Sequence, residues 1–409
     1  MACEIRYIEG GICAPSGFKA SAACGGFKAN AIKDDTALVV SEDICSAAAV
    51  YTKNKVKAAH IAVMKRHLAD GKAQAVIVNS GNANTCTANG EDIAEETCRL
   101  VAAGIGCDPA DVLPASTGVI GVPMEIEPFE RAMPGLVAGL SEKGSRAAAK
   151  GIMTTDTVPK ELAIAFSLSD GTECRIGGIA KGSGMIHINM GTMLAFLSSD
   201  IAITAEMLKK ALLDEIPDSF NQVSVDGDTS TNDTLAILAN GRAGNKLIDS
   251  ECEDYEIFRE ALHVICVDFS KKLASDGEGA TKLIEAHVTG APTKEIARSV
   301  SKGIICSSLF KAAIYGQDAN WGRILCAIGY TEAEFDTSNI DVSMASDKGS
   351  IEVCRGSAAV GFSEEKALEI LCEDSVIIEV DLNDGTESAY AWGCDLTHDY
   401  VTINGSYRS

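Results

Sequence analysis

The segment Lys181–Asp200 constrains the fold of this chain more than any other stretch. It begins with three small residues, Gly182-Ser183-Gly184, and continues into a short apolar run, Met193–Leu197, that polar residues bound on both sides. A run of this length and composition is typical of a strand buried on both faces. We therefore expect a central buried strand, with Thr192 at its start.

The residues at the start of this strand permit a chemical rearrangement. Gly191 has no side chain, so its carbonyl can be approached closely by Thr192 Oγ. Attack would convert the peptide into an ester, and hydrolysis would leave Thr192 as a new N-terminus. Its α-amine, with a pKa of about 7.7–8.0, could then act as the base for its own hydroxyl. On these residues alone, an ordinary strand threonine is the simpler interpretation.

Six further blocks of small and polar residues are spread along nearly the whole chain. They are Ala115–Gly121, Met153–Thr157, Asp228–Thr234, Asp276–Lys282, Asp318–Ile324 and Tyr400–Ser409. Together with Lys181–Asp200, and in the same order, they resemble the ornithine acetyltransferase family, also called the glutamate N-acetyltransferases. The resemblance implies an α+β fold, a layered sandwich of the self-cleaving ArgJ/DmpA-like type.

The resemblance also implies a reaction. The chain would cleave itself between Gly191 and Thr192 into a chain 1–191 and a chain 192–409. Thr192 would transfer acetyl from N2-acetyl-L-ornithine to L-glutamate in arginine biosynthesis, through an acetyl-Thr192 intermediate. No cofactor is implied, although bifunctional members also use acetyl-CoA as an acetyl donor. The two chains would stay associated, in a heterotetramer or larger oligomer.

The family's site residues map onto specific positions here. The resemblance assigns oxyanion stabilisation to Thr117 and Gly118, whose hydroxyl and backbone N–H are suitable donors. It assigns substrate contacts to Thr154, Lys181, Thr192, Glu278, Asn404 and Ser409. A cation such as Lys181 and a carboxylate such as Glu278 suit the two charges of an amino acid. The chain has Gly191, His187-Ile188 and Ser409 where the family more often has Ala, Ala-Pro and Thr.

Composition excludes several other classes of protein. The formal charge of −23 over 409 residues would repel nucleic acid. The fifteen cysteines are scattered without a C-x-x-C pair, so we expect reduced thiols in a cytoplasmic protein and no metal site. No apolar run is long enough to span a membrane.

Three ligand-binding motifs are matched only in part, because the residues that they require are absent at the necessary spacing. Gly182-Ser183-Gly184 lacks the third glycine of a dinucleotide fingerprint, and Gly177…Gly182 is followed by Ser183 where a P-loop needs lysine. Asp226–Asn232 begins like a calcium loop but has Thr231 where that loop needs glycine. We expect a polar loop lining a pocket, or a capped turn, instead. His187 is close to Thr192 in sequence, but a loop histidine is the favoured interpretation.

Strand and helix patterns cluster along the chain and do not alternate strictly. This favours layered α+β architecture over a doubly wound parallel sheet. Besides Met193–Leu197, strands are expected at Thr36–Ser41, Ala75–Val78, Glu161–Leu168, Cys174–Ile179, Asn221–Val225, Leu235–Leu238, Leu283–Val288, near Val342, and at Ile351–Cys354, Val376–Leu382, Ala389–Leu396 and Tyr400–Ile403. Helices are expected at Glu91–Ala103, Pro128–Lys150 with a break at Pro134-Gly135, Ala205–Asp214, Tyr255–Ala274, Thr293–Ile314 with a break at Gly303, and Ser363–Cys372.

Two other functions remain as alternatives at this point. One is an amidase or aminopeptidase on the same scaffold, in which water replaces glutamate. The other is an uncleaved amino-acid-binding protein, which would keep its full chain length when Thr192 is replaced.

Overall fold

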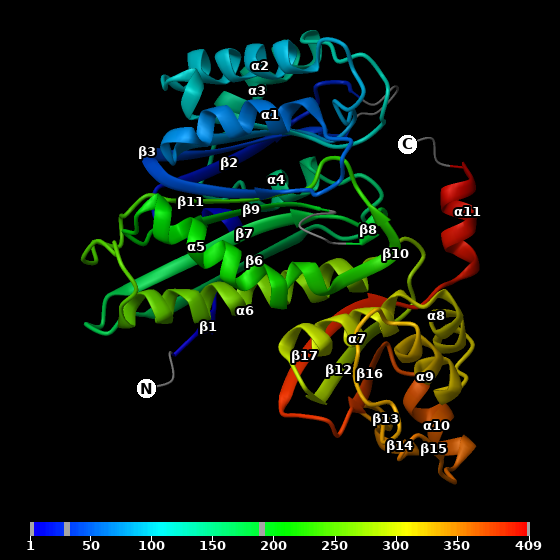
Figure 1. The fold of residues 1–409 in the computed structure, drawn as a ribbon. Coiled ribbons are helices and arrows are strands. Elements are labelled where there is room, and N and C mark those ends of the chain that lie inside the picture. The colour runs from blue at the N-terminus through cyan, green and yellow to red at the C-terminus, as the bar shows by residue number, and fades with distance from the viewer. Residues whose placement is uncertain (1–3, 28–32, 188–192, 407–409) are drawn as a thin grey trace.

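Two mixed β-sheets form the framework of the molecule (Figure 1). The structure, a computed structural model, describes residues 4–27, 33–187 and 193–406. The nine-stranded sheet contains β1 (Arg6–Tyr7), β2 (Phe18–Ala23), β3 (Thr36–Tyr51), β4 (Lys72–Asn79), β5 (Val112–Ser116), β6 (Lys160–Ser167), β7 (Glu173–Lys181), β9 (Leu194–Ser199) and β11 (Thr234–Ala239). Their order is β1-β6-β7-β9-β11-β3-β4-β5, and β2 pairs with β3.

The eight-stranded sheet is built mainly from the last third of the chain. It contains β8 (Ile186–His187), β10 (Val223–Thr229), β12 (Leu283–Ala291), β13 (Asp341–Ser346), β14 (Gly349–Arg355), β15 (Ala358–Ala359), β16 (Ser375–Asp381) and β17 (Glu387–Cys394). Their order is β15-β14-β13-β16-β12-β17-β10-β8.

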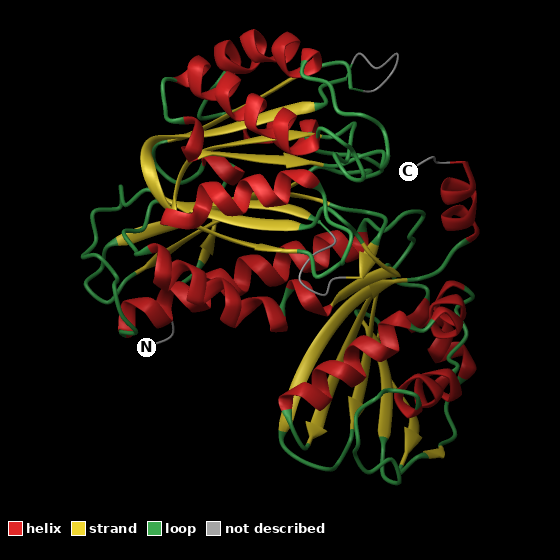
Figure 2. Ribbon diagram, turned by 45° about the horizontal axis from the view of Figure 1, so that its top comes forward, coloured by secondary structure: helices red, strands yellow, loops and turns green. Residues whose placement is uncertain are grey.

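Helices cover the faces of both sheets (Figure 2). They are α1 (Ala59–His67), α2 (Gly90–Ile105), α3 (Glu127–Gly139), α4 (Ser145–Gly151), α5 (Ala205–Glu215), α6 (Glu253–Ser275), α7 (Lys294–Cys306), α8 (Ser308–Tyr315), α9 (Trp321–Gly329), α10 (Glu364–Leu371) and α11 (His398–Ser406). The long helix α6 contacts β6 and β7 of one sheet and β10, β12 and β17 of the other, so it joins the two sheets.

Strand β9 is the central buried strand that the sequence predicts. All six of its residues are buried. Ala195 and Leu197 belong to the core cluster that includes α5 and α6. Leu194 and Phe196 belong to the cluster on the opposite face, which includes α4. The side chains of a strand alternate between faces, so this apolar run fills two cores at once. The layered α+β class predicted from the sequence is confirmed.

Two predicted helix breaks lie at the wrong place. Pro134-Gly135 does not interrupt α3, which continues to Gly139; the break comes before α4. Pro134 is exposed, and the apolar side of α3 (Ala132, Met133, Leu136) stays buried. The carbonyl that the missing N–H of proline leaves unbonded is therefore on the solvent side. Similarly, Gly303 lies inside α7, and the break comes at Ser307, which caps α8 through a bond from Phe310 N to its Oγ.

Three other local elements differ from what the sequence predicts. Strand β5 was not among the expected strands, and it runs from Val112 through Pro114 to Ser116. As β5 is the last strand of its sheet, a missing N–H there is tolerated. Residues Tyr400–Ile403 are helical, within α11, and Tyr400 N donates to Thr397 Oγ1 just before it. Helix α9 had no counterpart in the prediction.

Candidate active site

A cavity of about 490 Å³ collects the described residues that the sequence predicts for the site. Its lining includes all six of them: Thr117, Gly118, Thr154, Lys181, Glu278 and Asn404. Met193 and Leu194, which follow Thr192 in the chain, line it as well. Gly191, Thr192 and Ser409 lie outside the described residues. Residues far apart in sequence, from 117 to 404, thus meet at one place.

The Thr117-Gly118 turn follows the C-terminal end of β5. Strands β4 and β5 are parallel, with Asn79 paired to Ser116, so the loops after them meet at the same edge. Thr117 N donates to Asn79 O at 2.9 Å. Gly118 has φ +131°, and a Cβ there would lie 2.5 Å from the Gly81 carbonyl carbon. Only glycine fits this close approach. Gly118 is therefore required on steric grounds, in addition to offering its backbone N–H as a donor.

Asn232 anchors this turn from the opposite side. Its Nδ2 donates to Ser116 O at 2.8 Å and to Ala83 O at 2.5 Å. Its Oδ1 accepts from Thr85 Oγ1 at 3.0 Å. Asn232 ends the segment Asp226–Asn232, which lines the cavity as the sequence predicts. The segment is not all loop, because its residues up to Thr229 belong to β10. The sequence predicted no role for the Asn232 side chain, because these three partners lie at least 116 residues before it in the chain.

Lys181, the last residue of β7, points its charge into a protected site. It is only 7% exposed, and its ammonium donates no hydrogen bond to any residue in the described ranges. Burial lowers its pKa, and the nearby Asp156 opposes that effect. A buried ammonium with spare donors is well suited to a carboxylate ligand.

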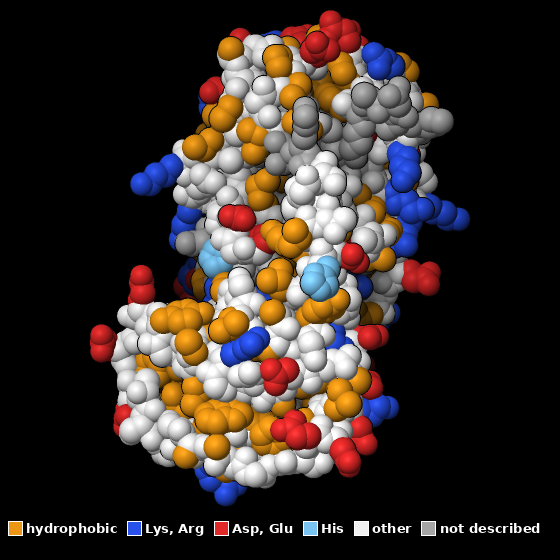
Figure 3. Space-filling model, turned by 90° about the vertical axis from the view of Figure 1, so that its right-hand side faces the viewer, with side chains coloured by type: hydrophobic (Ala, Val, Ile, Leu, Met, Phe, Trp, Pro, Cys, Tyr) orange, Lys and Arg blue, Asp and Glu red, His pale blue; other side chains and the backbone are white. Residues whose placement is uncertain are grey.

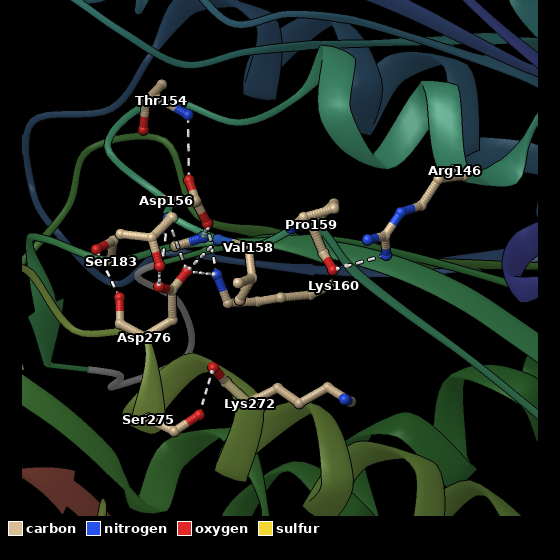
Figure 4. A network of polar contacts seen from close by, with 12 residues as sticks. Arg146, Thr154, Asp156, Val158, Pro159, Lys160, Ser183, Lys272, Ser275 and Asp276 are labelled. Carbon is tan, nitrogen blue, oxygen red and sulfur yellow. Dashed lines mark hydrogen bonds and ion pairs between the residues drawn. The ribbon is translucent and has the colours of Figure 1, made fainter. Parts of the chain in front are cut away.

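Asp156, on whose pKa the charge of Lys181 acts, belongs to a buried charge network that the sequence did not predict (Figure 4). Lys160 Nζ donates to Asp156 Oδ1 at 2.7 Å and to Asp276 Oδ2 at 2.5 Å. Burial opposes ionisation of Asp156, but Lys181, Lys160 and the Gly182 N–H outweigh it and lower its pKa to about 2. Asp156 and Asp276 lie within blocks that resemble the family, and this resemblance could have drawn attention to them. Lys160 lies in none of these blocks.

Glu278 provides the opposite charge at the cavity wall. It is 7% exposed, and its Oε2 accepts a hydrogen bond from Asn404 Nδ2 at 2.7 Å. Gly184 allows the carboxylate to sit this close to the loop after β7, since a Cβ there would lie 2.4 Å from it. Asn404 belongs to α11, which lies on the side of the molecule drawn in Figure 3. The cavity therefore holds both a cation and an anion.

His187 does not join this group. It ends the short strand β8, and its Nδ1 lies 3.2 Å from Ser224 Oγ and 3.5 Å from Cys306 Sγ. It lines a separate cavity with Lys302 and Arg298. Burial, and then the charge of Lys302, lower its pKa to about 4. His187 thus lies in a strand and not in the predicted loop, and that it is not the base stays a prediction.

The described residues contain no group of three or more His, Cys, Asp or Glu side chains that could hold a metal ion. All fourteen described cysteines are free thiols. Among the described helices, none is both long and apolar enough to cross a membrane.

Comparison with known proteins identifies the family of this chain. The model of the ArgJ family matches residues 19–409. This chain belongs to the ArgJ family. It is 48% identical over 393 residues to arginine biosynthesis bifunctional protein ArgJ 1 of Clostridium acetobutylicum, covering 96% of each chain. It is 46% identical over 407 residues to the ArgJ of Symbiobacterium thermophilum, covering 99% of this chain and all of the relative.

A solved structure gives the same result for part of the chain. The crystal structure of arginine biosynthesis bifunctional protein ArgJ from Bacillus halodurans superposes with a TM-score of 0.50 at 46% identity. It covers 52% of this chain and 98% of its own. The family inferred from the sequence blocks is confirmed, and the chain is an enzyme of the glutamate N-acetyltransferase class.

Proposed function

We propose that this chain cleaves itself between Gly191 and Thr192 and then transfers acetyl groups from N2-acetyl-L-ornithine to L-glutamate. The proposal rests on the set of residues that line one cavity. It is lined by an oxyanion-type donor pair, a buried cation, a buried carboxylate and the two residues that follow Thr192.

The transfer proceeds in two half-reactions. Thr192 Oγ attacks the acetyl carbonyl of the donor, and the Thr192 α-amine takes the hydroxyl proton. Thr117 Oγ–H and Gly118 N–H donate to the oxyanion. The intermediate collapses with loss of ornithine, whose amine receives that proton, and leaves an acetyl ester on Thr192. The glutamate amine then attacks the ester carbonyl, and the bond to Thr192 Oγ breaks. The Thr192 α-amine carries the proton lost by the glutamate nitrogen to Oγ, which restores the hydroxyl and releases N-acetylglutamate, so the kinetics are ping-pong.

The charges in the cavity support an amino-acid substrate. Lys181 would bind the α-carboxylate of ornithine or glutamate, and Glu278 would bind an amine. Thr154 and Asn404 would add polar contacts, and the family assigns a further substrate contact to the position of Ser409. No cofactor takes part, and acetyl-CoA is a second donor if this member is bifunctional.

The length of a relative supports the two-chain product. The Bacillus halodurans chain matches almost completely but covers only 52% of this chain, close to the length expected of residues 192–409. We propose that the two chains remain associated, in a cytoplasmic heterotetramer or larger assembly.

Intact-mass spectrometry of the purified wild type and its Thr192→Ala variant tests the proposal. We expect two masses, for residues 1–191 and 192–409, in the wild type and a single full-length mass in the variant. Acetyl transfer from N2-acetyl-L-ornithine to L-glutamate should be present only in the wild type. A single uncut wild-type chain would overturn the mechanism and favour an amino-acid-binding protein.

A further inference from the structure

Three buried charges form a continuous network outside the cavity wall. The side chains of Lys160 and Asp156 are 1% and 0% exposed, and that of Asp276 is 5% exposed. None of the three lines the cavity. Asp276 also accepts hydrogen bonds from the backbone N–H and the hydroxyl of Thr157. Burying one ammonium between two carboxylates is costly unless every member is well bonded, and here every member is.

Asp156 connects the network to the residues proposed to bind the substrate carboxylate. Its Oδ2 accepts from Thr154 N at 3.1 Å, and its Oδ1 accepts from Gly182 N at 2.7 Å. Thr154 and Lys181, the residue before Gly182, both line the cavity. Lys160 and these two backbone groups bond the Asp156 oxygens (Figure 4). Since no residue in the described ranges accepts a hydrogen bond from the Lys181 ammonium either, that ammonium can bind a ligand.

Asp276 connects the same lysine to the opposite side of the cavity. Its carbonyl accepts from Ser183 Oγ at 2.6 Å, and Glu278 N donates to Ser183 O at 3.1 Å. Glu278 is only two residues further along the chain. The position of the Glu278 carboxylate therefore depends on where Asp276 is held.

We propose that Lys160 is a positioning residue. By bonding Asp156 and Asp276 at once, it sets the separation between the Lys181 ammonium and the Glu278 carboxylate, and so matches the cavity to the two charges of an α-amino acid. This inference rests on the proposed substrate class. It also gives the ion pair a second role: Lys160 lies before the proposed cleavage point and Asp276 after it, so the pair joins the two product chains at the site.

The decisive variant is Lys160→Met, which keeps an unbranched side chain and removes the charge. Two buried carboxylates then lack their shared cation, and the Lys181 ammonium becomes the nearest replacement partner for Asp156. We expect L-ornithine, titrated calorimetrically into the cleaved enzyme, to bind about 10- to 100-fold more weakly, the scale on which small misplacements act in such sites. Acetylation of Thr192 by p-nitrophenyl acetate, which carries neither charge, should be unchanged.

A double variant protects the test against misfolding. Lys160→Met/Asp276→Asn removes one buried negative charge together with the positive one, and the amide oxygen can still accept from Thr157. It should fold, cleave and react with p-nitrophenyl acetate like the wild type, and still bind ornithine weakly. The matched control is Lys210→Met, which breaks an exposed ion pair with Asp214 four residues away and should bind ornithine normally.

The outcomes separate this inference from the proposed function. Wild-type ornithine affinity in the single or the double variant would overturn the positioning role. So would a double variant that loses cleavage, ester reaction and ornithine binding together, since that is the pattern of a purely structural residue. An uncleaved wild type that still binds ornithine would refute the proposed mechanism alone, and the comparison of ornithine affinities would still test Lys160.

Discussion

Thr117 shows how one hydroxyl in this cavity can be examined separately from the fold. Its backbone is held by Asn79 and the preceding carbonyl is held by Asn232, so the turn does not depend on the Thr117 side chain. Removing the hydroxyl should therefore affect the chemistry and leave the loop in place.

For Thr117→Val, we expect kcat to fall by about 10²–10³-fold with little change in KM, because one donor to the oxyanion is lost and substrate contacts remain. Steady-state kinetics with N2-acetyl-L-ornithine and L-glutamate measure this. Thr172→Val, on the loop between β6 and β7, is the control and should match the wild type. A Thr117→Val enzyme with unchanged kcat would remove the hydroxyl from the mechanism.

His60 leads to a prediction about acid stability. It is fully buried in α1, and burial lowers its pKa to about 3, from 6.5. The unfolded chain binds this proton first as the pH falls, so stability is complete above about pH 6.5 and is lost progressively toward pH 3. At pH 4.5 the loss from this residue is about 3 kcal/mol.

The variant His60→Leu should therefore resist acid better than the wild type. Urea unfolding at pH 7 and pH 4.5 gives the comparison. The wild type should lose more stability between the two pH values than the variant, by about that amount. An equal loss in both proteins would show that His60 does not titrate on unfolding.

At the level of elements, the sequence indicated most helices and strands. It did not indicate whether a strand-like run near the end of the chain would pair with a sheet. The run Met193–Leu197 identified a strand correctly, because a short, wholly apolar run bounded by polar residues is typical of a strand buried on both faces. The run Tyr400–Ile403 looked equally strand-like, since its residues are aromatic or β-branched. Whether such a run pairs depends on a free sheet edge, which local sequence does not reveal. Here Thr397 caps it as a helix instead.

The site was predictable to the same extent and for similar reasons. Thr117, Gly118, Thr154, Lys181, Glu278 and Asn404 stand in recognisable blocks, and the fold brings them together. The bonds from Lys160 to Asp276 and from Asn232 to Ser116 each span 116 residues, so no local pattern identifies these two contacts.

None of the residues of helix α11 is buried, so a substitution on it can be tested with little effect on the core. Its described link to the cavity includes the bond from Asn404 to Glu278. Asn404→Leu should raise KM for N2-acetyl-L-ornithine about 10-fold, the effect of losing one hydrogen bond to a charged group, with a smaller change in kcat. Thr402→Val on the same helix is the control. Equal KM values for the two variants would exclude Asn404 from substrate binding.

At the scale of the whole molecule, the proposed cleavage would divide the large sheet in an unusual way. Strands β9 and β11, which follow residue 192, lie side by side between β7 and β3, which precede it. β9 pairs with β7 over six residue pairs, and β11 pairs with β3 over six more. The central strands of one product would thus be enclosed on both edges by the other product.

Separation of the two product chains should therefore require unfolding. Both ladders would have to break, and the two clusters that β9 fills would be exposed to water. We expect the cleaved wild type and the uncleaved Thr192→Ala variant to elute alike in size-exclusion chromatography without denaturant. In strong denaturant only the wild type should resolve into two shorter chains. Release of either chain from the wild type under native conditions would contradict this pairing of strands.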